Sequence, residues 1–221
     1  MSSTVSNSDN LKTEGKKAFR IGLTGGIACG KSAIASLFES LDICIVDADA
    51  VAREVVEPGQ VCLKKITDHF GCEILNSDGT LNRRALREIV FATGAELKLE
   101  KLNALMKDAI REKIDEKIDE ADSPYVIVMI PLLFEHHLES MVNRILVVDI
   151  EYELQLKRLI NRDNISKELA ENMISRQVDR NTRIQKADDL IKSDDSPLDK
   201  KLNVVLKLHN EYLKLAKEFK Q

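Results

Sequence analysis

The amino-acid sequence predicts an α/β fold in which a parallel sheet is flanked by helices. Two observations favour this fold class. A strand-like segment at residues 19–24, a glycine-rich loop, an amphipathic helix and a second strand-like segment at 43–47 follow one another within about 30 residues, as in a βαβ unit. Two further short apolar segments, at 125–130 and 145–149, come after a long and mostly helical stretch.

The first elements are indicated by the spacing of their apolar residues. Residues 19–24 are largely apolar and run into Gly25-Gly26, as expected of a strand that enters a tight loop. After Lys31 the apolar residues are spaced to lie on one face of a helix: Ile34, Leu37, Phe38 and Leu41. Residues 43–47 then form a buried strand that ends in an acid, Asp47.

The segment 51–123 is predicted to be a helical domain. Turn residues at Pro58-Gly59 and Ser77-Asp78-Gly79 separate its helices. Between Lys98 and Glu120 the apolar residues recur at helical spacing along a charged helix: Leu99, Leu102, Leu105, Met106, Ile110, Ile114 and Ile118. A coiled coil is conceivable, but an amphipathic helix that closes a small subdomain needs fewer assumptions.

Two helical segments are expected in the last third of the chain. Residues 151–185 are helical in pattern and rich in arginine. From Lys201 the apolar residues again recur at helical spacing, which predicts a helix packed back on the sheet.

Composition excludes several classes of protein. Lys and Arg number 33 against 37 Asp and Glu, a net charge of −4, so we expect no nucleic-acid partner. No apolar stretch approaches the roughly 20 residues of a membrane-spanning helix, so we expect no membrane partner. The four cysteines lack zinc or redox spacing and are interpreted as reduced thiols of a cytoplasmic protein. Residues 1–18 carry no apolar signal segment and are expected to be a disordered leader.

The loop after the first strand has the full pattern of a phosphate-binding loop, G-x-x-x-x-G-K-[ST], over residues 25–32. Its glycines allow backbone N–H groups to converge on phosphate oxygens, and the following helix adds the positive end of its dipole. Lys31 is expected to bridge the β- and γ-phosphates, and the Ser32 hydroxyl to bind Mg²⁺.

Two acids end apolar strands, Asp47 and Asp149. Asp47 is followed by Asp49 at the carboxyl end of the strand next to the phosphate loop in sequence, where ligands bind in open α/β sheets. Two carboxylates beside a polyphosphate would repel it unless a metal or a substrate hydroxyl occupied them, which favours a catalytic role. Asp49 also suits a helix N-cap, and Asp149 is expected to end its strand structurally.

Five of the twelve arginines fall between residues 158 and 183. Arg158 and Arg162 are four residues apart, as are Arg176 and Arg180, so each pair repels unless an anion lies between its members. We interpret the segment as a lid that closes on ATP and presents a guanidinium to the transferring phosphoryl group. The alternative is ordinary surface pairing with three acids of the same segment: Glu168, Glu171 and Asp179.

With these motifs the sequence resembles the dephospho-coenzyme A kinases, a family of P-loop small-molecule kinases, from about residue 21 to 215. The most specific match is Val46-Asp47-Ala48-Asp49 followed by Ala52-Arg53-Glu54-Val55-Val56-Glu57-Pro58-Gly59. Further matches are the loop at 22–32, Asp78-Gly79, Leu81-Asn82-Arg83-Arg84, Pro124-Tyr125-Val126, Pro131-Leu132-Leu133, 146–149, Gln155 to Arg158, Arg162-Asp163, Gln177, Arg180 and 187–189.

The resemblance implies Mg²⁺-dependent transfer of the ATP γ-phosphoryl group to the ribose 3′-hydroxyl of dephospho-CoA, giving coenzyme A and ADP. It implies a nucleotide-binding core over 19–50, 124–150 and 186–221, an acceptor-binding domain over 51–123 and a lid over 151–185. The expected partners are the two small-molecule substrates. The oligomeric state stays open between a monomer and a weak homo-oligomer.

The resemblance also implies roles for particular residues. Lys31, Asp47 and Arg158 would be catalytic, with Ser32 on the metal. Because a carboxylate is a much weaker base than an alkoxide, we expect Asp47 mainly to orient the hydroxyl and to accept its proton late. The residues expected to bind ATP are Gly25, Gly26, Ile27, Ala28, Cys29, Gly30, Lys31, Ser32, Ala33, Arg158 and Arg162. Those expected to bind the acceptor are Thr24, Asp47, Asp49, Arg53 and Arg84.

Three positions depart from the family pattern. Ala28-Cys29 replaces the usual Gly-Ser, Lys107-Asp108 replaces a usual His-Pro, and Ser193-Asp194-Asp195 replaces a loop containing Asn and Gly near the adenine. Nucleotide binding should tolerate Ala28 unless its φ is positive. Because a helix N-terminus lowers the pKa of a thiol, we hypothesise that Cys29 makes the enzyme sensitive to oxidants.

Two other functions stay open. One is another P-loop small-molecule kinase that acts on a nucleotide or a sugar. The other is a nucleotide-dependent regulatory switch, for which neither the Asp47–Asp49 pair nor an arginine lid is required. The sequence Asp68-His69-Phe70-Gly71 fits a GTPase D-x-x-G pattern, but it follows helical sequence and no guanine-reading Asn-Lys-x-Asp segment exists, so we discount it.

Overall fold

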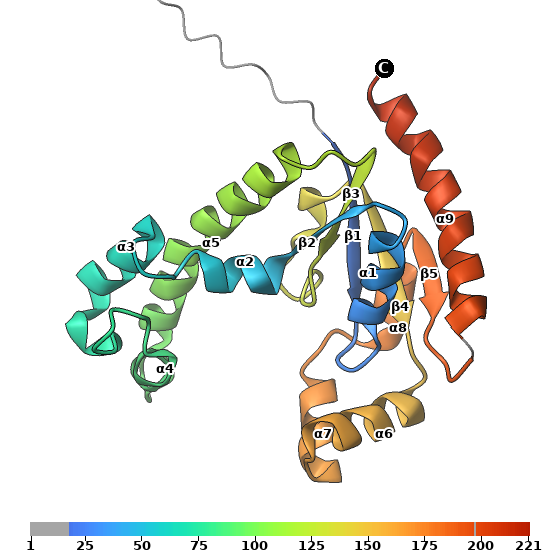
Figure 1. Cartoon of the computed structure of the whole chain (residues 1–221). Coiled ribbons are helices and arrows are strands. Elements are labelled where there is room, and N and C mark those ends of the chain that lie inside the picture. Colours follow the sequence, from blue (N-terminus) through green and yellow to red (C-terminus); the bar gives the residue numbers. More distant parts are fainter. Residues whose placement is uncertain (1–17, 197) are drawn as a thin grey trace, which may run out of the picture.

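The structure, a computed structural model, describes residues 18–196 and 198–221. All of the expected leader except Ala18 lies outside the described residues. Within them, five strands form one sheet in the order β2-β3-β1-β4-β5, and every pair of neighbours is parallel (Figure 1). The strands are β1 (Phe19–Gly25), β2 (Cys44–Asp47), β3 (Tyr125–Met129), β4 (Arg144–Asp149) and β5 (Asp189–Lys192). The predicted α/β fold with a parallel sheet is confirmed.

The edge strand β5 was not predicted from the sequence. Only Ile191 of its four residues is buried, so it lacks the continuous apolar run that marks the inner strands. Its first residue is held by tertiary contacts instead. Asp189 accepts two hydrogen bonds from the Arg144 guanidinium, at 2.6 and 2.9 Å, and a third from the Tyr212 hydroxyl at 2.8 Å.

One face of the sheet is covered by α1 (Lys31–Glu39) and α9 (Leu198–Phe219) (Figure 1). Both predicted helices are confirmed. Their apolar sides pack with the sheet in one buried cluster, in which Phe38 of α1 stacks on Tyr212 of α9. Tyr212 is fully buried, so the chain's last helix is a structural part of this layer.

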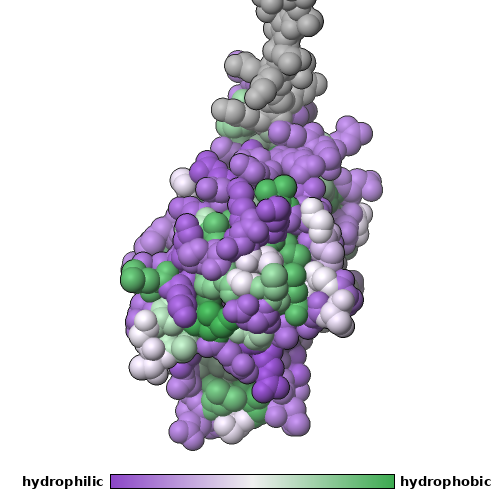
Figure 2. All heavy atoms as spheres, turned by 90° about the vertical axis from the view of Figure 1, so that its left-hand side faces the viewer, coloured by the Kyte–Doolittle hydropathy of each residue, from purple (hydrophilic) through white to green (hydrophobic). Residues whose placement is uncertain are grey.

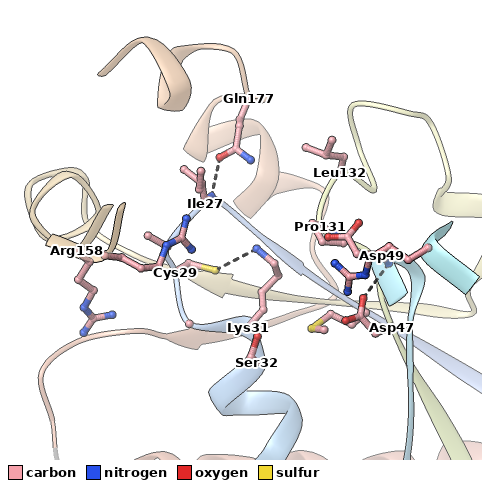
Figure 3. Close-up of a pocket in the computed structure, with 15 residues that line it drawn as sticks. Ile27, Cys29, Lys31, Ser32, Asp47, Asp49, Pro131, Leu132, Arg158 and Gln177 are labelled. Carbon is pink, nitrogen blue, oxygen red and sulfur yellow. Dashed lines mark hydrogen bonds between the residues drawn. The ribbon is translucent and has the colours of Figure 1, made fainter. Parts of the chain in front are cut away.

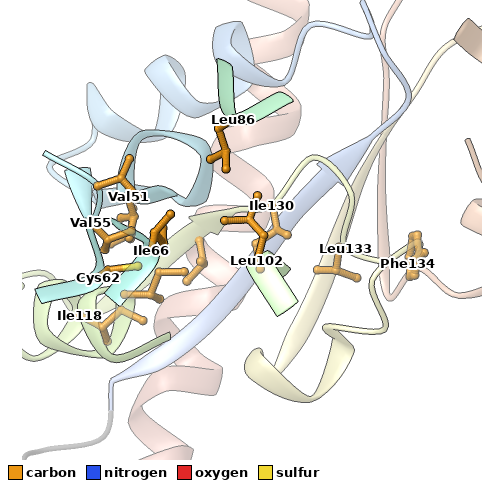
Figure 4. Packing of buried hydrophobic residues seen from close by; sticks show 14 of the residues in the cluster. Val51, Val55, Cys62, Ile66, Leu86, Leu102, Ile118, Ile130, Leu133 and Phe134 are labelled. Carbon is orange, nitrogen blue, oxygen red and sulfur yellow. The ribbon is translucent and has the colours of Figure 1, made fainter. Parts of the chain in front are cut away.

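The opposite face is covered by the helical insert: α2 (Ala48–Glu54), α3 (Val61–Phe70), the 3-10 helix η1 (Cys72–Ile74), α4 (Arg83–Val90) and α5 (Glu96–Asp119). As predicted, α5 is amphipathic and packs within this subdomain, with Leu102, Ile114 and Ile118 buried. Residues of α2, α3 and α5 share one hydrophobic cluster with Ile130 and Leu133, which follow β3 (Figure 4). The insert is therefore fused to the sheet by a common core.

The predicted helical segment at 151–185 consists of α6 (Tyr152–Asp163), α7 (Lys167–Ser175) and α8 (Arg180–Gln185). A second 3-10 helix, η2 (Glu139–Met141), precedes β4. Leu156, Leu159 and Ala170 form a small cluster within this segment, and Ile27 and Ala28 of the glycine-rich loop pack against it. Part of the loop thus completes the core of the segment interpreted as a lid.

The surface seen from the side of the insert is mostly hydrophilic, with hydrophobic patches between the charged groups (Figure 2). No helix in the described ranges is long and apolar enough to cross a membrane. All four cysteines are free, as the sequence predicted. The D-x-x-G match at 68–71 is the end of α3, where Asp68 pairs with Lys64, which agrees with discounting it.

Candidate active site

A cavity of about 750 Å³ lies at the carboxyl end of the sheet. Its walls come from the loop after β1, the start of α2, the residues after β3, and the lid helix α6 (Figure 3). The lining residues are Ile27, Ala28, Cys29, Gly30, Lys31, Ser32, Asp47, Asp49, Arg53, Met129, Pro131, Leu132, Arg158, Arg162 and Gln177. The structure therefore brings the loop, the acid pair and two lid arginines to one place.

The loop is shaped by glycine at positions that a side chain would obstruct. A Cβ on Gly25, whose φ is +151°, would lie 2.5 Å from the backbone oxygen of Val148 on the neighbouring strand. Gly30 is the N-cap of α1 and has a φ of 92°. The backbone N–H groups of the first turn of α1, beginning at Lys31, lack helical partners and are available to a ligand's phosphate oxygens.

Ala28 adopts the left-handed conformation, with φ of 57°. Nucleotide binding was expected to tolerate alanine at this position unless φ was positive, and φ is positive. Alanine is strained there by roughly 1 kcal/mol. The residue keeps the loop conformation because its side chain packs against the lid cluster.

Lys31 reaches back over the loop. Its ammonium group donates hydrogen bonds to the backbone oxygens of Gly25 and Gly26, at 2.9 and 3.1 Å, and lies 3.8 Å from the Cys29 sulfur. The charge is therefore held above the concave side of the loop, where phosphate oxygens would replace these neutral acceptors. Ser32, one residue further, is exposed and lines the same cavity.

Asp47 lies next to Asp49, on the side of the cavity opposite the glycine-rich loop (Figure 3). One Asp47 oxygen accepts a 2.9 Å hydrogen bond from the backbone N–H of Asp49, so Asp47 is the N-cap of α2. The expectation that Asp49 is the N-cap is wrong, because α2 begins at Ala48, one residue after Asp47. Capping uses one carboxylate oxygen of Asp47, and the residue lines the cavity.

The lid arginines each bind separate partners. Arg158 donates to the Ser193 hydroxyl at 2.8 Å, and to the Asp194 backbone oxygen and the Asp195 carboxylate, both at 2.9 Å. Arg162 pairs with Asp163. The Ser193-Asp194-Asp195 loop, which departs from the family pattern, therefore holds Arg158 at the cavity wall. Neither arginine pairs with the acids proposed from the sequence, which were Glu168, Glu171 and Asp179.

Arg180 anchors the lid to the sheet. It makes two hydrogen bonds to the Asp149 carboxylate, at 2.6 and 2.8 Å, and two to Glu151, both at 2.6 Å. The Arg180 hydrogen bonds hold the pKa of Asp149 below its usual range, despite desolvation. Asp149 is 7% exposed and has the structural role expected for it.

Two glutamines that were not predicted as site residues hold the tip of the loop. Gln177 accepts a 2.7 Å hydrogen bond from the N–H of Ile27 (Figure 3), and the Gln155 amide donates to the Ile27 backbone oxygen at 2.9 Å. A Cβ on Gly26 would lie 2.6 Å from the Gln155 amide nitrogen, so glycine permits this approach. We call Gln155 and Gln177 the glutamine clamp. Sequence signals existed, since both belong to matched motifs, but no pattern indicated a contact across more than 120 residues.

Several predicted residues lie elsewhere. Arg84 is on α4, where it pairs with Glu88 with its side chain 89% exposed, and it does not line the cavity. Thr24 is buried and its hydroxyl donates to the Pro131 backbone oxygen at 3.4 Å. Ala33 is exposed and follows Ser32, the last loop residue that lines the cavity. Gly25 and Gly26 do not line the cavity, but their backbone oxygens accept the hydrogen bonds from Lys31.

The premise of the Cys29 hypothesis, that the helix N-terminus lowers the pKa of this thiol, is wrong. Its side chain is 0% exposed, and burial raises the pKa of the thiol. The cations of Lys31 and Arg183 offset only part of that rise. A sequence pattern shows that Cys29 precedes a helix, but it does not show that the sulfur points into the protein.

The G-x-x-x-x-G-K-S loop, the opposed carboxylate and the arginine-bearing helix α6, on a parallel sheet flanked by helices, define a P-loop kinase. A shikimate kinase from Bacteroides thetaiotaomicron shares this fold, with a TM-score of 0.51 over 88% of this chain and 99% of that one, at 14% identity. The dephospho-CoA kinase family model matches residues 19–199, and the chain belongs to the dephospho-CoA kinase family.

Individual relatives agree with this assignment. The chain is 46% identical to a dephospho-CoA kinase of Pseudoalteromonas translucida over 196 residues, which cover 89% of this chain and 92% of that protein. It is also similar to the solved structure of a dephospho-CoA kinase from Campylobacter jejuni, with 31% identity and a TM-score of 0.65 over 88% of this chain and 97% of that one.

Proposed function

We propose that this chain transfers the γ-phosphoryl group of ATP to the ribose 3′-hydroxyl of dephospho-CoA, forming coenzyme A and ADP. The observation that carries the proposal is the placement of Asp47 across one cavity from Lys31 and the phosphate loop. A carboxylate there suits an acceptor hydroxyl, whereas a protein that only binds nucleotide has no need of it. Family membership supports the choice of acceptor.

In the proposed reaction the acceptor oxygen forms a bond to the γ-phosphorus while the bond from that phosphorus to the β,γ-bridging oxygen breaks, leaving ADP. The free oxygen of Asp47 aligns the hydroxyl and accepts its proton late in the transfer. Lys31 moves from the Gly25 and Gly26 carbonyls to the phosphate oxygens, and Arg158 and Arg162 neutralise charge from the lid side. These roles are assigned because all four side chains line the cavity.

Mg²⁺ fits this donor set. The Ser32 hydroxyl would hold it together with phosphate oxygens and water, the oxygen-rich coordination that magnesium prefers. Bound there, the ion would neutralise phosphate charge during transfer. The described residues contain no cluster of three or more acidic, histidine or cysteine ligands, which agrees with an ion brought in with the nucleotide.

We assign a different role in the reaction to each of three parts of the chain. The core over 19–50, 124–150 and 186–221 binds ATP, the insert over 51–123 holds the acceptor, and the lid over 151–185 covers the phosphates. Arg53 lines the cavity on the insert side and would contact an acceptor anion there. The free cysteines suit a reducing compartment, so we place the reaction in the cytoplasm.

The test is product analysis. ATP, Mg²⁺ and dephospho-CoA are incubated with the protein, and mass spectrometry with fragmentation locates the added phosphate. We expect it on the 3′ oxygen of the ribose, with one ADP formed per coenzyme A. Turnover with a nucleoside monophosphate or a sugar, and none with dephospho-CoA, would instead indicate a different small-molecule kinase. Slow ATP hydrolysis that no acceptor accelerates would indicate a nucleotide-dependent switch.

A further inference from the structure

A second cavity, of about 430 Å³, lies between α5 and the segment that connects β3 to η2. Its lining shares no residue with the cavity described above. One wall is a single face of α5, and the other is the stretch 136–141. The lining residues are Asn103, Met106, Lys107, Ile110, Arg111, His136, His137, Leu138, Ser140 and Met141.

The walls of this cavity carry four basic side chains, and Glu139, the acid near His137, forms its ion pair with Lys186 at 2.9 Å. Lys107 and Arg111 are four residues apart on α5 and face the same space, where like charges repel. His136 and His137 line the opposite wall. Across residues 18–196 and 198–221, no ion pair joins any of these four side chains to a carboxylate. Such an arrangement is suited to an anion supplied by a ligand.

Apart from Asn103 and Ser140, the rest of the lining is apolar and packs against the protein core. Met106, Ile110, Leu138 and Met141 are partly buried and pack against the cluster that joins the insert to the sheet. This second cavity therefore combines a firm apolar surface with a cationic rim. A ligand that matches it has an anionic group joined to a flexible, weakly polar chain.

The two cavities are neighbours along the chain. Leu132 lines the first and His136 the second, and the His136 N–H donates to the Leu132 backbone oxygen at 3.1 Å. A further bond, from the Leu138 N–H to the Leu133 oxygen at 2.9 Å, closes the turn. One ordered turn thus separates the reacting centre from the cationic cavity.

We infer that the second cavity holds the part of the acceptor remote from the reacting hydroxyl, an inference that rests on the proposed function. Dephospho-CoA carries a pyrophosphate followed by a pantetheine chain on the 5′ side of its ribose. Lys107 and Arg111 bind the pyrophosphate, and the chain lies on the apolar surface. Lys107 stands where the family usually has histidine, so this chain places a permanent charge at that point.

The test compares two acceptors that share the reacting hydroxyl. Adenosine lacks the pyrophosphate and the pantetheine, whereas dephospho-CoA has both. We expect Lys107→Met and Arg111→Met each to raise KM for dephospho-CoA about tenfold, because each variant loses one charge-assisted hydrogen bond to the pyrophosphate. KM for adenosine and for ATP should not change. Lys101→Met is the matched control, because Lys101 is an exposed lysine of α5 outside the cavity lining.

Calorimetric titration of dephospho-CoA into each variant provides a second readout that does not depend on turnover. We expect its Kd to rise with KM in the two cavity variants and to stay at the wild-type value in the control. Equal effects on both acceptors, or none, would overturn the inference while leaving the proposed function intact. Failure of the wild-type protein to use dephospho-CoA would instead overturn the proposed function, and this assignment with it.

Discussion

Asp47 has a structural role in the fold beside the chemical role that we propose for it. One of its oxygens caps α2 through the Asp49 N–H, and this bond fixes the direction of the carboxylate. Asparagine is as good an N-cap as aspartate, because its side-chain oxygen accepts the same hydrogen bond. Replacing aspartate by asparagine therefore separates the charge of Asp47 from its role in the fold.

We expect Asp47→Asn to lower kcat about a hundredfold or more, in the range for loss of a proton acceptor, with a much smaller change in KM. The thermal unfolding midpoint should stay close to that of the wild type. Steady-state kinetics with both substrates and a thermal melt check this. Equal changes in kcat and KM would assign Asp47 to binding instead of to the transition state.

Among the described residues that line the cavity, Lys31 carries the one side-chain ammonium group. We expect Lys31→Met to reduce kcat about a hundredfold or more, because the charge facing the phosphates is lost while the side-chain length is kept. Single-turnover measurements at saturating ATP check this. Near-normal kcat would show that the loop is misassigned.

Cys29 yields a prediction opposite to the one its sequence position suggested. Because the thiol is buried and its pKa is raised, it should react slowly, whereas Cys72 is exposed. We expect peroxide to inactivate Cys29→Ser and the wild type at the same rate. Mass spectrometric mapping of brief iodoacetamide labelling should find Cys72 modified before Cys29. Protection from peroxide in Cys29→Ser would restore the oxidant-sensor hypothesis.

At the scale of elements, the lid and the phosphate loop are built as a unit. The glutamine clamp holds both sides of the Ile27 residue from two separate parts of the lid, α6 and the connection between α7 and α8. The side chain of Ile27 also packs into the lid cluster. The base of the lid therefore sets the position of the loop, and only more distal parts of the lid are free of that contact.

We expect Gln155→Met and Gln177→Met each to weaken ADP binding about threefold to tenfold, the usual worth of one hydrogen bond to the backbone. The double variant should lose less than the product of the two, because both residues act on the same loop residue. Calorimetric titration of ADP measures all three, and Gln185→Met, an exposed lid glutamine, is the control. Strictly multiplicative losses would show that the two glutamines act independently.

At the scale of the whole molecule, an ion pair between the buried Asp149 and the half-buried Arg180 ties α8 to the sheet. The pKa of Asp149 is lowered in the folded protein, chiefly by the hydrogen bonds from Arg180. The pair therefore stabilises the fold fully at pH values above the unfolded-state pKa of about 4. Its contribution is lost as the pH falls through the lower folded-state pKa.

We expect Arg180→Met to lower the free energy of unfolding by about 2 kcal/mol at pH 7, because it leaves the buried Asp149 carboxylate without its cation. The difference from the wild type should shrink as the pH is lowered from 5 toward 2. Urea unfolding at several pH values checks this, with the exposed lid residue Arg176→Met as the control. A difference that does not depend on pH would contradict the ion-pair account.

Much of the fold was predictable because its elements carry local signals. The inner strands are continuous apolar runs, and α1, α5 and α9 have clear helical spacing. Strand β5 was missed because its stability comes from Asp189 meeting Arg144 and Tyr212, contacts that join distant parts of the chain. Similarly, the phosphate loop and Asp47 were found from motifs, whereas Arg84 was placed at the site only by resemblance.

The sequence by itself determined the phosphate loop, the acid at the end of β2 and the arginine-rich helical segment at 151–185, because each is a local pattern. The tertiary structure decided what each side chain does there: that Cys29 points inward, that Arg158 is held by the 193–195 loop, and that two glutamines grip Ile27. These depend on burial and on contacts across 35 to 150 residues of chain, which no local pattern encodes.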